Sequence, residues 1–237
     1  MNGKFIVIDG STGSGKSTII RAVKDWAKDP GLRYFDLADW CLNHDAPPEF
    51  SDIEEFDLLF TFEPTKNWIG SAIRYEMSQT ENPYTGLELA QAFSLDRLIM
   101  YKRLIIPALK AGKVIIQDRS VTSSIAIQPV LPGGPTLDEI MNLPGNIFAI
   151  THAPTDLILT DLAPELIEER ISKRAEYTKG VFEDIELIKK VAGRFKADWF
   201  LKTFTDRGTE VHTIDTSLPF VEMKENVVKL IDHILSK

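Results

Sequence analysis

Eight residues near the amino terminus have the types and spacing needed to hold a chain of phosphate groups. They are Gly10–Ser17, with the sequence Gly-Ser-Thr-Gly-Ser-Gly-Lys-Ser. Such a glycine-rich turn curls so that successive N–H groups face one concavity, and the dipole of a following helix adds positive potential there. Lys16 can reach the outer phosphates, and the Ser17 hydroxyl is a ligand that Mg²⁺ accepts. The pattern predicts a P-loop that binds a nucleoside triphosphate.

The surroundings of this loop match what a P-loop needs. An apolar strand is predicted over Phe5–Ile8, and a helix over 15–28. The residues expected to bind ATP are Gly10, Ser11, Thr12, Gly13, Ser14, Gly15, Lys16, Ser17 and Thr18.

A second apolar strand, over 114–117, delivers Asp118 and Arg119 to the edge of the predicted sheet. An Asp so placed helps to organise the magnesium shell beside the P-loop hydroxyl, so Ser17 and Asp118 are the expected metal residues. Arg119 has the planar fork that grips a phosphate. A structural Asp118–Arg119 ion pair is an alternative that is compatible with both roles.

Two further segments suit a second, non-phosphate ligand group. Glu63 ends the predicted strand 58–62, where it can accept a hydrogen bond from a substrate hydroxyl or from Arg119, although an exposed turn residue has the same pattern. Phe93 and Arg97 are four residues apart on a predicted helix and share a face. An aromatic plane beside a guanidinium fits a nucleobase, whereas spacing alone favours a core Phe beside a surface Asp96–Arg97 pair.

A basic cluster follows the predicted helix 164–176. Arg170, Lys173 and Arg174 can supply the mobile positive charge that closes over a transferring phosphoryl group and keeps water out. Ion pairing on the helix surface is the alternative. We expect a lid over about 173–182, with Arg174 as its catalytic cation.

Alternating strand and helix signals position these residues. The strands expected are Phe5–Ile8, Leu58–Phe62, Val114–Gln117, Leu157–Thr160 and Val211–Ile214. The helices expected are 15–28, 67–79, 86–111, 121–128, 164–176, 184–205 and 219–236. The alternation predicts an α/β protein with three layers, in which helices flank a mostly parallel five-stranded sheet of the P-loop NTPase type and a small lid is attached. Ligands then bind at the carboxyl ends of the strands.

Composition limits the remaining possibilities. The 237 residues predict a single domain over 1–237, interrupted by an acidic insertion at 29–57. The net charge of −8 argues against a nucleic acid polymer as partner. Cys41 is the sole cysteine, and no leader, membrane span or metal-ligand spacing of histidines is apparent, so we expect a soluble cytoplasmic protein.

Taken together, the motifs resemble the thymidylate kinase family of P-loop nucleoside monophosphate kinases. The resemblance runs through most of the chain in the family's order. Its pieces are Phe5–Ser17, Phe62–Pro64 with Gly70–Arg74, Phe93–Arg97, Ile106–Arg119, Ser123-Ser124 with Gln128, and Leu162–Glu165 leading to Arg170 and Arg174.

The resemblance implies roles for single residues. It makes Phe93 the aromatic that stacks on thymine, Arg97 the reader of a pyrimidine carbonyl, and Arg119 the clamp on the acceptor phosphate. Glu63, Ser124 and Gln128 join them as substrate-binding residues, and Lys16, Asp118, Arg119 and Arg174 are the catalytic set. It also implies ATP, Mg²⁺, dTMP as the acceptor and a homodimer.

The chain departs from the family pattern at Thr12, Phe62, Ser120, Ile127 and Gly180-Val181. These positions concern the acceptor or the lid, and none concerns ATP binding. Two alternatives therefore stay open. One is a deoxynucleoside kinase that uses Glu63 as base for a hydroxyl, and the other is a nucleotide-binding module without turnover.

Overall fold

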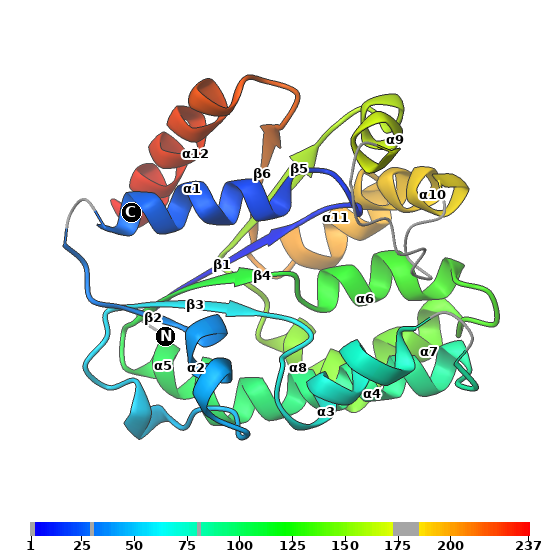
Figure 1. Ribbon diagram of the computed structural model, residues 1–237, viewed down its shortest axis with the longest axis horizontal. Helices are drawn as coiled ribbons and strands as arrows, with labels where there is room; N and C mark the ends of the chain where they lie inside the picture. Colours follow the sequence, from blue (N-terminus) through cyan, green and yellow to red (C-terminus); the bar gives the residue numbers. More distant parts are fainter. Residues whose placement is uncertain (1–2, 29–30, 80–81, 173–184) are drawn as a thin grey trace.

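Six apolar strands form one sheet in the computed structural model, which describes residues 3–28, 31–79, 82–172 and 185–237. The strand order is β2-β3-β4-β1-β5-β6, and every pairing is parallel (Figure 1). The strands are β1 (Lys4–Asp9), β2 (Tyr34–Asp36), β3 (Leu58–Phe62), β4 (Val114–Asp118), β5 (Asp156–Asp161) and β6 (Glu210–Asp215). A parallel sheet needs a crossover between successive strands, and the helices supply these crossovers.

Twelve helices are found in the described residues. They are α1 (Lys16–Lys28), α2 (Leu37–Asn43), α3 (Trp68–Ala72), α4 (Gly86–Met100), α5 (Ile106–Lys110), α6 (Val121–Ile127), α7 (Leu137–Asn142), α8 (Pro144–Thr151), α9 (Pro164–Ser172), α10 (Ile185–Phe195), α11 (Asp198–Thr205) and α12 (Phe220–Leu235). Short 3-10 or π turns are η1 (Phe50–Asp52), η2 (Ile73–Met77), η3 (Tyr101–Ile105) and η4 (Gln128–Val130). None of the helices in these described segments is long and apolar enough to cross a membrane.

The sheet is apolar on both faces because it lies between two helical layers. In β1, Ile6 and Ile8 pack with α1 and α12 on one face, whereas Phe5 and Val7 contribute to the core on the other face. Figure 1 shows α1 and α12 side by side on the first face and the larger helical group on the second. The three-layer α/β architecture expected from the sequence is therefore confirmed.

The expected strand count of five is wrong, because β2 adds a sixth strand. It pairs with β3 and lies within the range 29–57, where no strand was expected. Three residues are too few for a periodic signal, and tertiary packing fixes them instead. Phe35, Leu37 and Ile53 from this range are buried in the core. The range thus builds one edge of the sheet, and its status as an insertion relative to the family stays a prediction.

The helices differ from the expected ones in several places, and the range 67–79 contains α3 followed by η2. The range 184–205 divides into α10 and α11, with extended backbone at Ala197. The long helix expected at 86–111 is present, but π turns of η3 interrupt it between α4 and α5. Helices α7 and α8 were not expected, because each is short and its apolar residues cover little more than two turns.

Candidate active site

The P-loop joins the carboxyl end of β1 to the first turn of α1. Gly10 has φ 147°, and a side chain there would meet the Thr160 hydroxyl at 2.1 Å, so only glycine fits this close approach. The Lys16 ammonium donates to the carbonyls of Gly10 at 2.9 Å and Ser11 at 2.6 Å. These contacts hold its positive charge against the loop, where phosphate would bind.

A pocket of about 480 Å³ opens at this loop. Gly13, Gly15, Lys16, Ser17 and Thr18 line it, whereas Ser11 and Ser14 are buried within the loop. We call this cavity the phosphate pocket. Its far wall is formed by Arg170 of α9 and by the segment from Thr216 to Met223, which includes Leu218 and Phe220.

Asp9, the last residue of β1, is a buried anchor that the sequence analysis did not single out. Its carboxylate accepts hydrogen bonds from Gly10 N at 2.8 Å, Thr122 Oγ1 at 2.5 Å and Ser123 Oγ at 2.9 Å. It also lies 3.6 Å from the Arg119 guanidinium. Its place at the carboxyl end of β1, where parallel sheets bind ligands, is the sequence feature that could have identified it as a site residue. Asp9 therefore ties the P-loop to α6 and to Arg119.

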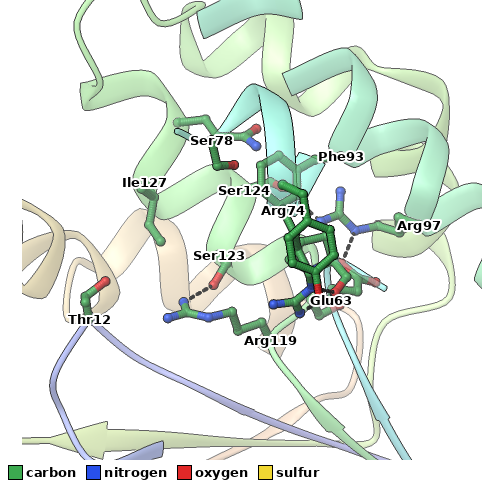
Figure 2. A pocket seen from close by; sticks show the side chains of 14 residues that line it. Thr12, Glu63, Arg74, Ser78, Phe93, Arg97, Arg119, Ser123, Ser124 and Ile127 are labelled. Atoms are coloured by element: carbon green, nitrogen blue, oxygen red, sulfur yellow. Dashed lines mark hydrogen bonds and ion pairs between the residues drawn. The ribbon is translucent and has the colours of Figure 1, made fainter. Parts of the chain in front are cut away.

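Arg119 follows β4 in a left-handed conformation, with φ 63°, which is unusual for a residue with a side chain. Its Nη1 donates to Ser123 at 2.9 Å, as Figure 2 shows. Arg119 and Thr12 line both the phosphate pocket and a second cavity beside it. These two residues mark the boundary at which the contents of the two cavities would meet.

Asp118 lies at the end of β4, and burial raises the pKa of its carboxyl group even though Arg119 and Lys16 act against the rise. Within the described residues, its Oδ1 is buried and has no hydrogen-bond partner. A hard-oxygen donor of this kind suits Mg²⁺ with its waters, and Ser17 lines the same phosphate pocket. The two residues therefore fit a magnesium ion that accompanies a nucleotide.

The second cavity, which we call the acceptor pocket, has a volume of about 440 Å³ (Figure 2). It brings together residues from the P-loop, from the segment after β3, and from α4 and α6. All six expected substrate-binding residues line it, and these are Glu63, Phe93, Arg97, Arg119, Ser124 and Gln128. The departures from the family pattern at Thr12, Ser120 and Ile127 line it as well.

Arg97 is almost fully buried, at 1% exposure, so the alternative of a surface Asp–Arg pair does not describe it. Its Nε and Nη2 donate to Glu63 Oε2 at 2.9 and 2.8 Å, and its Nη2 also donates to Ser124 Oγ at 2.9 Å. Glu63 Oε1 accepts from Gln117 Nε2 at 3.2 Å. Burial raises the pKa of Glu63 to about 7 although Arg97 favours its charged form.

Arg74 is a pocket residue that the sequence analysis quoted in a motif but did not list as a site residue. Its Nε donates to the carbonyls of Pro64 and Thr65, each at 2.9 Å, and its guanidinium lies 5.2 Å from the Phe62 ring. A lone Arg on a short helix gives no spacing signal, so only the fold reveals that it faces the same cavity as Arg119.

Gln128 follows α6 and is 3% exposed. In the described part of the chain, its Oε1 is buried without a hydrogen-bond partner. A buried amide oxygen left unpaired is costly, so its position beside the acceptor pocket is consistent with a ligand or a water.

Of the expected basic cluster, the structure describes Arg170. Arg170 lines the phosphate pocket and its Nη2 donates to the Thr216 carbonyl at 2.6 Å. Lys173, Arg174 and the expected lid over 173–182 lie outside the described residues.

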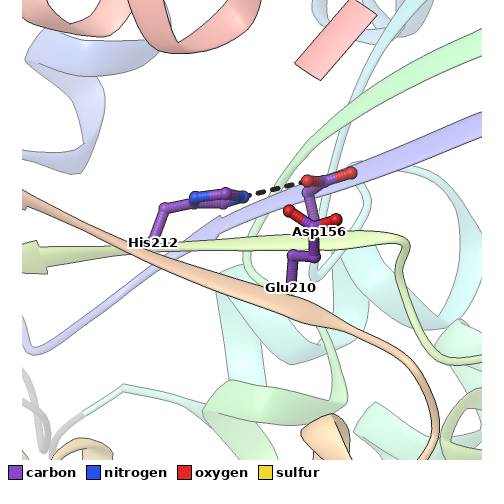
Figure 3. A group of neighbouring side chains, drawn as sticks. All are labelled: Asp156, Glu210 and His212. Carbon is purple, nitrogen blue, oxygen red and sulfur yellow. Dashed lines mark hydrogen bonds and ion pairs between the residues drawn. The ribbon is translucent and has the colours of Figure 1, made fainter. Parts of the chain in front are cut away.

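A second group of chemically versatile side chains lies far from these pockets, near the amino ends of β5 and β6 (Figure 3). Asp156, Glu210 and His212 place their ligand atoms within 4.8 Å of one another. His212 Nε2 is 2.9 Å from Asp156 Oδ1, and Lys237 Nζ is 2.5 Å from Glu210. The contact of His212 with Asp156 and the ion pair of Lys237 with Glu210 account for the cluster as a link between the two strands and Lys237, which follows α12.

The P-loop lies at the carboxyl end of a parallel sheet. Its pocket meets, at Arg119 and Thr12, a cavity that holds the aromatic ring of Phe93 and two further arginines. This arrangement defines a phosphoryl-transferring P-loop kinase. The model of the thymidylate kinase family matches residues 51–227. A probable thymidylate kinase of Methanococcoides burtonii is 31% identical over 99% of each chain. A thymidylate kinase of Caldicellulosiruptor saccharolyticus is 28% identical over the full length of both. The chain belongs to the thymidylate kinase family.

Proposed function

We propose that this protein transfers the γ-phosphoryl group of ATP to dTMP, which gives dTDP and ADP. The observation that carries the proposal is the meeting of the phosphate and acceptor pockets at Thr12 and Arg119. Two substrates bound in these cavities have their phosphates at one boundary, which is the arrangement that direct phosphoryl transfer needs. Family membership supports dTMP as the acceptor.

On the donor side, Gly10–Thr18 bind the phosphates of ATP. Lys16 already lies against the loop and supplies positive charge to the outer phosphates. Leu218, Phe220 and Met223 give the far wall of the phosphate pocket an apolar surface for the purine.

Ser17 and Asp118 are the residues that would hold Mg²⁺ with the nucleotide. When bound there, the ion neutralises charge on the phosphate oxygens. The unpaired Oδ1 of Asp118 supports this assignment. The raised pKa of Asp118 belongs to the metal-free pocket, since a nearby cation favours the charged carboxylate.

On the acceptor side, Phe93 offers a ring to the thymine, and Arg97, Ser124 and Gln128 face its polar edge. Because Ser124 Oγ accepts from Arg97, its own hydroxyl proton is available for a base carbonyl. Arg119 and Arg74 line the same pocket, and we assign them to the monophosphate.

In the transfer step, an oxygen of the dTMP phosphate attacks the γ-phosphorus of ATP in line. The new P–O bond forms as the bond to the ADP oxygen breaks, and ADP leaves with that electron pair. Lys16, Arg119 and Arg170 hold the charge that spreads over the transferring group, and we assign Arg174 of the lid to the same task. A phosphate nucleophile needs no base, so positioning is the main demand.

The structure weighs against Glu63 as the base of a nucleoside kinase. Both of its carboxylate oxygens accept hydrogen bonds, one from Gln117 and the other from Arg97. One carboxylate oxygen thus orients Arg97 and the other holds Gln117, although Glu63 lines the pocket. No observation favours a module without turnover.

We also keep a homodimer, a cytoplasmic location and the absence of a nucleic acid partner as predictions. Exposed Leu87 and Leu95 on α4 and Ile147 on the adjacent α8 support association through this side. Sedimentation equilibrium of the purified protein would determine the oligomeric state.

The test of the function is ADP release from ATP and Mg²⁺ with dTMP, dUMP, dCMP, UMP and thymidine as acceptors. Turnover with dTMP well above the others supports the proposal. Turnover with thymidine alone would assign the protein to the nucleoside kinases and make Glu63 the base. Binding of ATP without turnover of any acceptor would contradict an enzymatic role.

A further inference from the structure

Arg97 has a third interaction partner, besides Glu63 and Ser124, that no pattern in the sequence connects with the acceptor site. Its Nη1 donates to Oδ1 of Asn146, a residue of α8 that is fully buried. Asn146 does not line the acceptor pocket.

The hydrogen bonds of Arg97 leave little freedom to its guanidinium. A guanidinium has five N–H donors, and Glu63, Ser124 and Asn146 accept four hydrogen bonds from them. Glu63 fixes the Nε side, and Asn146 fixes Nη1 at the other end of the fork. Among the described residues, one Nη1 proton is left for a ligand.

Asn146 is itself held in one orientation. Its Nδ2 donates to the Ile140 carbonyl at 2.7 Å, so its Oδ1 must face Arg97. An amide rotated by half a turn would place N–H groups against the donors of Arg97 and an oxygen against a carbonyl. The acceptor offered to Arg97 is therefore defined without ambiguity.

The helix that carries Asn146 is docked closely on the helix that carries Arg97. Gly145 N donates to Ser94 Oγ at 2.9 Å, and a Cβ on Gly145 would lie 1.8 Å from the Ser94 carbonyl oxygen. Ser94 is one turn before Arg97 on α4. The glycine thus allows α8 to bring Asn146 within reach of the guanidinium.

We propose that Asn146 is a positioning residue for acceptor recognition, which aims Arg97 at the polar edge of the pyrimidine and so helps the site to prefer dTMP over dCMP. The inference rests on the proposed function and deepens it. Thymine presents a carbonyl oxygen where cytosine presents an amino group, and only a correctly aimed N–H donor distinguishes the two. An Arg97 that lost its Nη1 anchor would lose part of that discrimination.

The test compares Asn146→Leu, which keeps the size but removes the acceptor, with Asn146→Asp, which keeps an acceptor for Arg97. We expect Asn146→Leu to weaken dTMP binding about tenfold in calorimetry and to raise the KM for dTMP to match. The KM for ATP and the binding of dCMP should change far less. Asn146→Asp should restore most of the dTMP affinity. Asn146→Ala removes the same acceptor without added bulk and replaces the Leu variant if that variant does not fold.

Two controls separate positioning from a general structural effect. Asn142→Leu alters an exposed Asn on the neighbouring α7, which bonds only within its own helix, and should leave every constant unchanged. In an Arg97→Ala background, Asn146→Leu should cause no further loss of dTMP affinity, because the group that it positions is absent.

The outcomes distinguish this inference from the proposed function. If the unchanged protein neither binds nor phosphorylates dTMP, the proposed function fails and the inference falls with it. If the unchanged protein does both, equal losses for dTMP, dCMP and ATP in Asn146→Leu would overturn the positioning role alone. The positioning role would also be overturned if the losses of dTMP affinity caused by Asn146→Leu and Arg97→Ala were fully additive in the double variant.

Discussion

The phosphate pocket and the acceptor pocket are neighbours of similar size, but they are built in different ways. The first takes half of its lining residues from one continuous run of chain, Thr12–Thr18, at the junction of β1 and α1. The second collects side chains from the P-loop, from the segment after β3, and from helices far apart in the sequence. Local backbone geometry makes the first pocket, whereas tertiary packing makes the second.

This difference separates the tasks of the two cavities. A triphosphate is recognised by backbone N–H groups and a helix terminus, which depend little on distant residues. A particular nucleobase is recognised by Phe93 and Arg97, and Arg97 depends in turn on Glu63, Ser124 and Asn146. Substitutions should therefore affect ATP and the acceptor separately, except where a residue belongs to both pockets.

The largest expected effect is at Lys16, because its charge acts on the transferring group itself. Lys16→Ala should lower kcat/KM about 10³-fold, which corresponds to roughly 4 kcal/mol of lost transition-state stabilisation. Steady-state kinetics with dTMP and ATP would measure this, and Lys28→Ala, on the exposed last turn of the same helix, is the matched control. Activity within a few-fold of the unchanged protein would mean that the phosphate site is wrongly placed.

A substitution of Arg119 should affect both ATP and the acceptor, since Arg119 lines both pockets. Arg119→Ala should reduce kcat about 10²-fold and also raise the KM for dTMP, as expected for a lost phosphate partner. The fold should survive, because Asp9 keeps its hydrogen bonds from Gly10, Thr122 and Ser123. Arg207→Ala removes an exposed arginine as a control. An effect confined to ATP would contradict the position of Arg119 at the boundary.

A substitution of Asp118 should affect the phosphate pocket alone, because Asp118 acts on ATP through the magnesium ion. Asp118→Asn should lower activity about tenfold at limiting Mg²⁺ and raise the Mg²⁺ concentration for half-maximal rate. dTMP binding without ATP should stay nearly constant in calorimetry. An unchanged Mg²⁺ dependence would remove Asp118 from the metal site.

Glu63 should have the smallest effect on turnover, since it acts through Arg97. Glu63→Gln should change the KM for dTMP by less than about tenfold, because the amide still accepts from Arg97. If Glu63→Gln instead abolished turnover of thymidine, Glu63 would be the base for a hydroxyl acceptor, and the nucleoside kinase alternative would be restored.

The pH dependence of stability gives Glu63 a second test. Its pKa of about 7 in the folded protein exceeds the ordinary 4.5, so the folded state holds this proton more tightly than the unfolded chain does. Stability from this group is fully present below about pH 4.5 and is lost as pH rises through 7, by up to roughly 3 kcal/mol. Glu63→Gln should remove this decline in urea unfolding between pH 5 and 8. Arg97, Asp96 and Asp9 are the charged groups that act on Glu63, so a decline that persists in Glu63→Gln would assign the pH dependence to other groups than Glu63.

Several features could be predicted because they depend on neighbours in the sequence. The P-loop needs glycines and a Lys at fixed spacing. The strand that ends at Asp118 and the strand that ends just before Glu63 are both apolar runs. Helices α1 and α12 are long and amphipathic, so their periodic patterns located them to within a residue or two. The family resemblance then supplied Phe93, Arg97, Ser124 and Gln128, which spacing alone left open.

Other features required the fold. Strand β2 and helices α7 and α8 are too short to show a period, and Asp9 looked like an ordinary strand residue. Arg74 and Asn146 had no recognisable spacing to any partner, because their partners lie in other elements.

The sequence by itself determined that this chain is a P-loop α/β protein with a phosphate site at the end of its first strand, because a few adjacent residues fix the local backbone there. Only the tertiary structure decided what surrounds the acceptor. The buried charge of Arg97 must be matched by acceptors from the segment after β3, from α6 and from α8. Hydrogen bonds between such distant segments exist only after the helices have packed on the sheet.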